Sequence, residues 1–207
     1  MKRNSGFTLI EMVVVLAVVA ILAAILTPTI TKNIDDSKIA RANNEAQVIA
    51  AAMGSFYKDL GRWPTMQGTG STNDYWYLIY SDGNAMNTGG TAQWRSTGGW
   101  SARSDTFANH LARNTPGGSA ANPYTITGEL AWKGPYITAV TADPWGAHYS
   151  CNIRSLWQTT GTPAWNTVAV YILSAGKDRI PDTDHQQSIT STTPPIIDGD
   201  DVGYRVQ

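Results

Sequence analysis

The feature that most constrains this chain is an apolar run from Leu9 to Leu26, which only Glu11 interrupts. A helix rises 1.5 Å per residue, so these 18 residues would span about 27 Å, close to the thickness of a bilayer core. Lys2 and Arg3 precede the run, and basic residues stay on the cytoplasmic side. The run predicts a membrane-spanning helix with a cytoplasmic N-terminus and the rest of the chain on the outer side.

Two ordinary interpretations of this segment fit poorly. A secretory signal peptide would need a fuller basic region, a shorter apolar run and a small-residue cleavage site. A plain membrane anchor leaves Glu11 unexplained, because an ionised carboxylate in lipid costs a few kcal/mol unless a partner neutralises it. The carboxylate therefore indicates a function inside the membrane or an assembly derived from it.

The segment from Gly6 to Glu11 reads GFTLIE and resembles the prepilin processing motif of type IV pilins and type II secretion pseudopilins. The resemblance implies that a prepilin peptidase and methyltransferase cleaves between Gly6 and Phe7 and N-methylates Phe7. Residues 1–6 would be a leader peptide and residues 7–30 the transmembrane half of a long helix. The ammonium of one Phe7 and the carboxylate of a neighbour's Glu11 would neutralise each other in the filament and set its register.

Pro28 follows the apolar run and lacks a backbone donor, so we expect it to interrupt the helix against the carbonyl of Ala24. Thr27 and Thr29 flank it and can satisfy the freed backbone groups. Two interpretations stay open for Pro28. One is a tolerated kink at the membrane edge, and the other, implied by the resemblance, is a local melting of the helix during filament assembly.

Residues 31–61 have the pattern of an amphipathic helix. Its apolar positions step by three and four along one face, with charged residues mostly off it; they are Ile39, Ala42, Ala46, Ile49, Met53, Phe56 and Leu60. A coiled coil is the alternative, but about three heptads with weak flanking charges are short for one. Gly61 should end the helix, and Pro64 prevents its continuation.

Residues 62–207 are expected to form the globular domain. Its first part, residues 66–128, is rich in Gly, Ser, Thr and Asn with weak periodicity, which predicts a long loop region. One short helix is predicted near Asp105–Asn114, carrying Phe107 and Leu111. The aromatic residues of the loop, among them Trp76, Trp94 and Trp100, either pack the loop onto the long helix or stack on sugars.

Three segments read as strands between turn residues, namely 147–154, 168–173 and 201–206. We expect them to form a small antiparallel sheet that packs on the apolar stripe of the helix. The predicted fold class is α+β: a pilin-like fold with a long N-terminal helix, a small sheet and a long loop insertion.

A second resemblance covers four short blocks, which read WKGPYI at 132–137, DPWG at 143–146, GRWPT at 61–65 and SAGKD at 174–178. These blocks are similar to the type II secretion major pseudopilin (general secretion pathway protein G). Residues 69–128 have no counterpart in it. The block at 143–146 also reads as a turn by itself, since Pro presets the turn and Gly permits positive φ.

The C-terminal loop, residues 174–201, is acidic, with Asp at 178, 182, 184, 198, 200 and 201. Clustered carboxylates and carbonyls are calcium ligands, though the spacing is not that of an EF-hand. The resemblance implies one calcium ion; its ligands would be Leu173 (carbonyl), Ser174, Asp178 and Asp200 or Asp201. Arg179 stands where the family has a glycine, and the loop is longer than usual, so a solvated acidic loop stays the alternative.

Catalysis and nucleic-acid binding find little support. The net charge is −1 and no basic stripe is visible, which disfavours nucleic acid. His110, His148 and His185 lack metal-type spacing, and the single Cys151 cannot form an internal disulfide. On one strand, His148 and Cys151 would face opposite sides, so they are not a nucleophile and its base. The chain is predicted not to be an enzyme.

The leading hypothesis is a structural subunit of a pseudopilus that drives protein export in a type II secretion-like system. Its implied partners are further copies of itself, minor pseudopilins, the prepilin peptidase and an inner-membrane assembly platform. The chain would cross the inner membrane once, with its C-terminal domain in the periplasm, and later join a periplasmic or surface filament. The alternatives are a type IV pilus subunit, major or minor, in adhesion or motility, and a glycan-recognising module at a filament tip.

Overall fold

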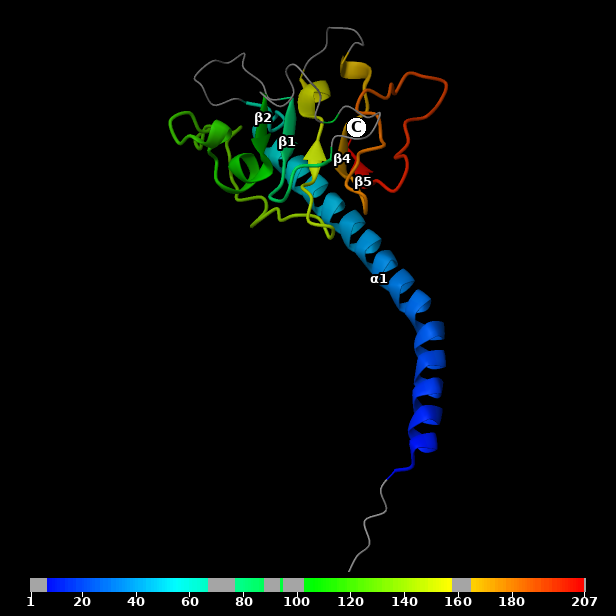
Figure 1. Ribbon diagram of the computed structural model, residues 1–207. Helices are drawn as coiled ribbons and strands as arrows, with labels where there is room; N and C mark the ends of the chain where they lie inside the picture. The colour runs from blue at the N-terminus through cyan, green and yellow to red at the C-terminus, as the bar shows by residue number, and fades with distance from the viewer. Residues whose placement is uncertain (1–6, 67–76, 88–93, 95–102, 158–164, 207) are drawn as a thin grey trace, which may run out of the picture. The chain divides into compact units, whose positions relative to one another are not determined.

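A computed structural model describes residues 7–66, 77–87, 94, 103–157 and 165–206. The chain divides into two compact units, Met1–Lys38 and Ile39–Gln207, which we call the N-terminal unit and the globular unit. One long helix, α1 (Leu9–Leu60), contributes to both of them (Figure 1). Gly6 and the rest of the expected leader lie outside the described residues.

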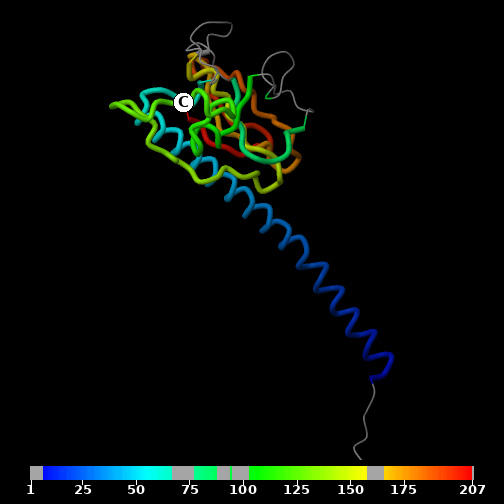
Figure 2. The backbone as a smooth tube through the Cα atoms, turned by 90° about the vertical axis from the view of Figure 1, so that its left-hand side faces the viewer, coloured from blue at the N-terminus to red at the C-terminus, as the bar shows by residue number. Residues whose placement is uncertain are grey.

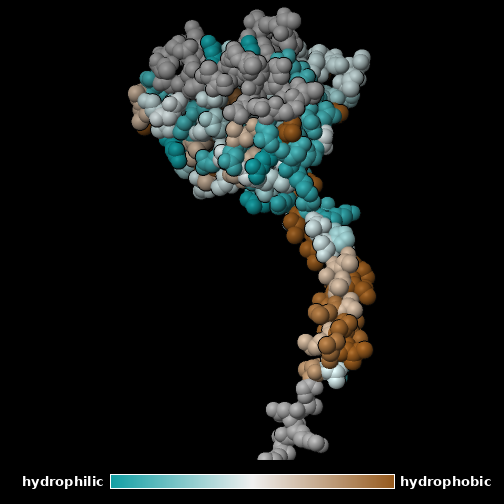
Figure 3. Space-filling view, viewed as in Figure 1, coloured by the Kyte–Doolittle hydropathy of each residue, from teal (hydrophilic) through white to brown (hydrophobic). Residues whose placement is uncertain are grey.

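In the N-terminal unit, all residues from Phe7 to Ile34 are solvent-exposed. Figure 3 shows the apolar surface of this stretch as a brown column of side chains. Within the described chain, α1 is the one helix long and apolar enough to cross a membrane, by length and composition. An apolar surface of this kind needs lipid or protein around it.

In the globular unit, α1 buries the face that the sequence predicts. The buried positions are Ala42, Ala46, Ile49, Ala52, Met53, Phe56 and Leu60. Ile39, at the start of the predicted stripe, is instead 41% exposed. The helix ends as expected at Gly61, which has φ +66° and whose N–H donates to the carbonyl of Tyr57 at 2.8 Å.

The sheet has five short strands: β1 (Leu78–Tyr80), β2 (Ser104–Thr106), β3 (Ser150–Cys151), β4 (Tyr171–Ser174) and β5 (Val202–Arg205). Their order is β2-β1-β3-β4-β5. The three strands predicted from the sequence are present as β3, β4 and β5, and they pair antiparallel. The first two are shorter than predicted, since β3 has two residues and β4 begins only at Tyr171.

The expectation of a purely antiparallel sheet and of a strandless loop over 66–128 was wrong. Both β1 and β2 lie in that region, and they pair in parallel, with Ile79 opposite Asp105. The sheet is therefore mixed. Strands of three residues carry too little periodicity to be read from sequence, and their pairing depends on partners far along the chain.

Strand β4 is the centre of the fold because both of its faces are buried. Ile172 joins the core under α1, together with Phe56, Tyr149 and Cys151. Tyr171 and Leu173 point the other way, as the period of two requires, into a second core with Met86 and Trp94. Figure 2 shows the helix segment of the globular unit, in cyan, running along one side of the remaining chain.

The region after β2 contains the predicted short helix. It is a single π-helical segment, Ala108–Ala112, with Phe107 and Leu111 fully buried beside it. Short 3₁₀ segments complete the regular structure at Pro116–Gly118, Ile153–Leu156 and Trp165–Thr167.

A buried polar chain ties this region together. Asp105 Oδ2 lies 2.9 Å from His110 Nε2, and His110 Nδ1 lies 2.7 Å from the hydroxyl of Tyr124. The ring of Tyr124 in turn packs edge-on against Phe56 of α1, with centroids 4.9 Å apart. The region that was expected to be a loop is thereby packed onto the helix.

Candidate functional site

The N-terminus of α1 is closed by a reciprocal cap between Thr8 and Glu11. The backbone N–H and the hydroxyl of Thr8 both donate to Glu11 Oε2 at 2.8 Å. The N–H of Glu11 in turn donates to Thr8 Oγ1 at 3.3 Å. This is a capping box, in which each residue satisfies a backbone donor of the other. The Thr-x-x-Glu spacing before an apolar run signals it, but Glu11 was interpreted from the sequence only as a partner for a neighbouring subunit.

The cap changes how Glu11 is held in a single chain. Its carboxylate is not bare, because one oxygen accepts two hydrogen bonds from Thr8 and lies beside the positive end of the helix. Phe7, immediately before the cap, is 82% exposed. The bond expected to be cleaved joins Phe7 to Gly6, and Gly6 lies outside the described residues.

Pro28 lies within a continuous α1, so the predicted interruption of the helix was wrong. Hydroxyl groups on both sides of the proline hydrogen-bond to the backbone. Thr27 Oγ1 donates to the carbonyl of Ala23 at 2.7 Å, and Thr31 Oγ1 donates to the carbonyl of Pro28 at 2.9 Å. Neither of these two bonds reaches the carbonyl of Ala24, which the proline leaves without its usual donor.

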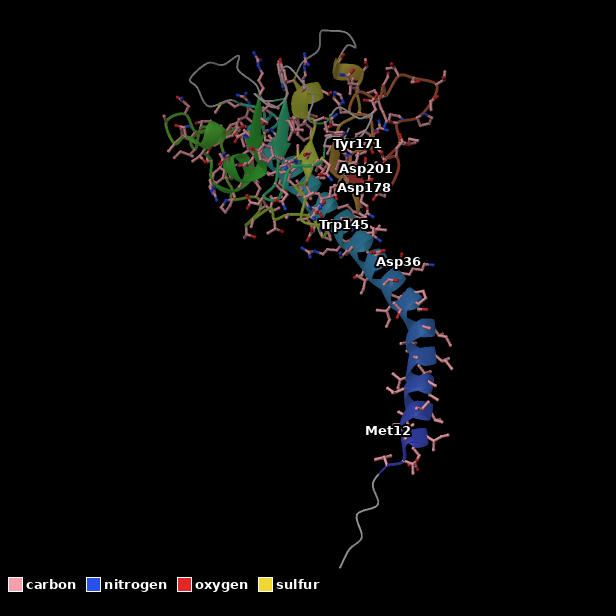
Figure 4. The ribbon with its side chains drawn as sticks, viewed as in Figure 1. Met12, Asp36, Trp145, Tyr171, Asp178 and Asp201 are labelled. Atoms are coloured by element: carbon pink, nitrogen blue, oxygen red, sulfur yellow. The ribbon has the colours of Figure 1, made fainter. Side chains whose placement is uncertain are left out.

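The two chain regions expected to bind calcium lie next to each other. Strands β4 and β5 pair so that Ser174 is opposite Val202, which puts the end of β4 beside Asp201. Asp200 Oδ2 accepts the N–H groups of Lys177 and Asp178 at 2.7 and 3.2 Å. Figure 4 labels Asp178 and Asp201 on these two segments.

Asp201 is the most unusual of the expected ligands. It is only 8% exposed, and its Oδ2 accepts the N–H groups of Asp182 and Thr183 at 2.9 and 2.7 Å. Its Oδ1 is buried and has no hydrogen-bond partner among the described residues. Burial raises the pKa of this carboxyl to about 6. The buried Oδ1 of Asp201 therefore lacks a partner, and a bound cation or a proton on the carboxyl would provide one.

The other expected ligands are engaged within the protein. The hydroxyl of Ser174 donates to Asp143 Oδ2, and Asp178 Oδ1 accepts the N–H of Ile180 at 2.7 Å. The carbonyl of Leu173 belongs to the end of β4. In the described part of the chain, no three His, Cys, Asp or Glu side chains are grouped closely enough to hold a metal ion. Asp201 is the one expected ligand with a buried carboxylate oxygen that has no hydrogen-bond partner among the described residues, and calcium binding stays a prediction.

The remaining candidates for chemistry are structural. Burial raises the pKa of the Cys151 thiol, which is fully enclosed and thus a poor nucleophile. Trp94, one of the aromatics considered for stacking on sugars, is 1% exposed and belongs to the second core. Trp76 and Trp100 lie outside the described residues. Trp94 therefore packs inside the fold, but in the second core and not onto α1 as the simpler alternative expected.

Comparisons with known proteins agree with the N-terminal site. Residues 1–27 match the model of the prokaryotic N-terminal methylation motif. Over 66 residues, 32% of this chain and 46% of the relative, the chain is 36% identical to the type II secretion system core protein G of Pseudomonas aeruginosa. Over 100 residues, 46% of this chain and 65% of the relative, it is 36% identical to the fimbrial protein EcpC of Eikenella corrodens.

A third relative is the type IV major pilin protein PilA of Myxococcus xanthus, 39% identical over 61 residues, which are 30% of this chain and 28% of the relative. The matched part of the chain spans less than two thirds of the length of each of these relatives. No solved structure matches.

In its capped apolar helix, its methylation motif and the stretches shared with these relatives, the chain is similar to proteins of the pilin and pseudopilin superfamily. Its α+β fold, with a long N-terminal helix packed on a small mixed sheet, agrees with that assignment. Proteins of this class are membrane-anchored subunits that form filaments, and the motif implies processing by a prepilin peptidase. The relatives that it matches are a secretion system core protein, a fimbrial protein and a major pilin, which agrees with the expectation of a structural subunit.

Proposed function

We propose that this protein is the structural subunit of a pseudopilus in a type II secretion-like system. It is cleaved between Gly6 and Phe7, N-methylated on Phe7 and assembled through α1 into a filament that drives protein export. Before assembly it crosses the inner membrane once, with the N-terminus in the cytoplasm and the globular unit in the periplasm. Its partners are copies of itself, minor pseudopilins, the peptidase and an assembly platform.

The observation that carries this proposal is how the pseudopilin-like blocks meet in the fold. Asp143, in the block at 143–146, accepts a hydrogen bond from Ser174, in the block at 174–178. Tyr136, in the block at 132–137, packs its ring 5.5 Å from that of Phe56 on α1. The resemblance thus depends on residues that form one connected layer, which supports a shared architecture beyond the common N-terminal motif.

A type IV pilus subunit is the second candidate, and a specific observation favours it. The alignment with the fimbrial protein is longer than that with the secretion protein, 100 residues against 66. Residues 69–128, which the pseudopilin resemblance does not cover, also contribute β1 and β2 to the sheet. The two candidates differ in what the filament does and not in how the subunit is built.

A strain that lacks this gene separates the two candidates. We expect it to lose specific exported proteins from the culture supernatant while sheared surface filaments stay as in the parent. Loss of surface filaments with unchanged secretion would instead make the protein a pilus subunit. Complementation with the parent gene should restore export, whereas a Glu11→Ala gene should yield processed protein but little filament. Normal filaments from Glu11→Ala would contradict the pairing of Phe7 with Glu11.

We further propose that Asp201 is part of a calcium site with Leu173, Ser174, Asp178 and Asp200. The support is the buried, partnerless Oδ1 of Asp201, since a buried carboxylate is costly without a cation. The bound ion would neutralise this carboxylate and hold the acidic loop against β5. Melting of the full chain in detergent should shift upward with calcium relative to chelator, and Asp201→Asn should remove the shift. An equal melting temperature in calcium and in chelator would exclude the site.

A further inference from the structure

Residues 84–87 are anchored on the sheet side of the globular unit. Asn84 forms a β-bridge with Ala147, and its N–H donates to the carbonyl of Gly146 at 2.9 Å. The N–H of His148 donates back to the carbonyl of Asn84 at 3.0 Å. Two residues further on, Met86 is buried in the second core beside Leu173. Asn84 and Met86 thus hold this segment against the globular unit just before the residues that contact the acidic loop.

The next contacts of this segment are with the acidic loop itself. The N–H of Asn87 donates to the carbonyl of Arg179 at 2.7 Å, and its side-chain amide donates to the carbonyl of Asp178 at 2.9 Å. Trp94 is buried, and its Nε1 donates to the carbonyl of Thr183. Each of these bonds joins residues about ninety positions apart in the chain. All three acceptors are main-chain carbonyls of the loop.

The other side of the same loop backbone is satisfied from the C-terminus. Asp200 accepts the N–H groups of Lys177 and Asp178, and Asp201 accepts those of Asp182 and Thr183. The loop is thus held from two sides: the carboxylates of Asp200 and Asp201 accept hydrogen bonds from its N–H groups, and groups of Asn87 and Trp94 donate to its carbonyls. Several such bonds acting on one short loop restrict it strongly.

Arg179 shows why the loop needs this support. It has φ +62°, a left-handed conformation that glycine adopts freely and that other residues adopt at a cost. The carbonyl of Arg179 is the one held by the N–H of Asn87. The bond from Asn87 therefore falls at the strained residue, where an unsupported backbone would relax first.

We infer that Asn87 and Trp94 are positioning residues that fasten the acidic loop to the globular unit, and we call these two residues the clasp. The clasp belongs to residues 69–128, the part of the chain without a counterpart in the pseudopilin resemblance, and it gives that part a defined task. The inference does not depend on which filament the protein forms. It also differs from the calcium proposal, because the clasp bonds carbonyls of the loop and no carboxylate.

Hydrogen exchange of the full chain in detergent, with chelator, tests the clasp on peptides covering 177–184. Asn87→Ala removes the bond to Asp178, and Trp94→Phe keeps a buried ring but removes the bond to Thr183. Each should speed exchange of the loop about fivefold, the loss expected from one hydrogen bond. Adding Arg179→Gly to Asn87→Ala should restore part of the protection, because glycine adopts the left-handed conformation without strain.

The matched control is Trp132→Phe. Trp132 is also an indole whose Nε1 donates to a main-chain carbonyl, that of His110 at 3.1 Å, but it lies away from the acidic loop. It should leave exchange over 177–184 unchanged. Unchanged loop exchange in both clasp variants would overturn the inference, as would an equal increase in Trp132→Phe. The inference also fails if calcium abolishes the effect of both clasp variants, because the ion would then fasten the loop.

Discussion

The two parts of α1 belong to one continuous helix but have different environments. From Leu9 to Ile34 every residue is exposed in the single chain, whereas from Ala42 to Leu60 one face is buried in the globular unit. The first part is apolar on all sides from Met12 to Leu26, and the second is apolar on one stripe. A helix that is apolar all round needs lipid or neighbouring protein, and an amphipathic helix needs only its own domain. The comparison separates residues that act in assembly from residues that act in folding.

The largest expected difference between the two parts comes from matched truncations. Phe56→Ala removes a fully buried ring that contacts Tyr124 and Tyr136, and it should lower the free energy of unfolding of the globular unit by about 3–5 kcal/mol. Leu16→Ala should leave that free energy unchanged, since Leu16 is 66% exposed. Denaturant unfolding in detergent, followed by near-ultraviolet circular dichroism, measures both. Equal losses would mean that the first part also stabilises the globular unit.

Acid should lower the free energy of unfolding of the globular unit through His185. Burial lowers the pKa of this histidine to about 4, below its ordinary value near 6.5. The unfolded chain then binds the proton more tightly, so the stabilising contribution is complete above about pH 6.5 and is lost as pH falls toward 4. The loss amounts to about 3 kcal/mol.

Asp201 titrates in the opposite direction, because its raised pKa stabilises the fold at low pH. We therefore expect Asp201→Asn to unfold more steeply on acidification than the parent, and His185→Asn to unfold less steeply. Urea titrations between pH 7 and 4.5, with chelator present, measure these slopes. Identical slopes in the two variants would show that neither group controls the acid response.

A smaller effect is expected at the start of α1. Thr8→Ala removes the hydroxyl that bonds to Glu11 and accepts its N–H, so the first turn should fray. Amide exchange near Met12 should speed up about fivefold, while exchange in the globular unit stays the same. Thr8→Ser keeps the hydroxyl and is the control. The capping interpretation requires Thr8→Ser to exchange like the parent.

The smallest effect is expected from Gly54→Ala on the exposed side of α1. Gly54 has helical geometry, and a Cβ there would meet no atom within 4 Å. Alanine should stabilise the globular unit by about 0.5–1 kcal/mol, because it costs less backbone entropy in a helix. Chemical denaturation measures the gain. If the same variant assembles poorly, the open space beside Gly54 is filled in the filament by another subunit.

Sequence reasoning succeeded where the signal was local. The apolar stripe from Ala42 to Leu60 and the end of the helix at Gly61 follow from periodicity and from one residue type. The central strand β4 was predicted because consecutive β-branched and aromatic residues read as a buried strand. These features depend on neighbours within a few positions.

What sequence reasoning missed depends on contacts between distant segments. Strands β1 and β2 are too short to show a pattern, and their parallel pairing brings together residues about 26 positions apart. The partners of Asn87 and Trp94 lie about ninety positions away. Pro28 was expected to interrupt the helix, but α1 runs through it. The Thr8–Glu11 cap could be predicted from its spacing, but Glu11 was interpreted through the family motif as a partner for Phe7 of a neighbouring subunit.

In the proposed filament, the cap at the start of α1 has a consequence for the kinetics of assembly. A carboxylate that is already hydrogen-bonded to Thr8 can exchange that donor for the ammonium of an arriving subunit, one bond forming as another breaks. Such an exchange avoids a fully unpaired charge in an apolar medium, which would be the highest point on the pathway. Thr8 would then set the barrier for adding a subunit, while Glu11 sets the affinity that holds it.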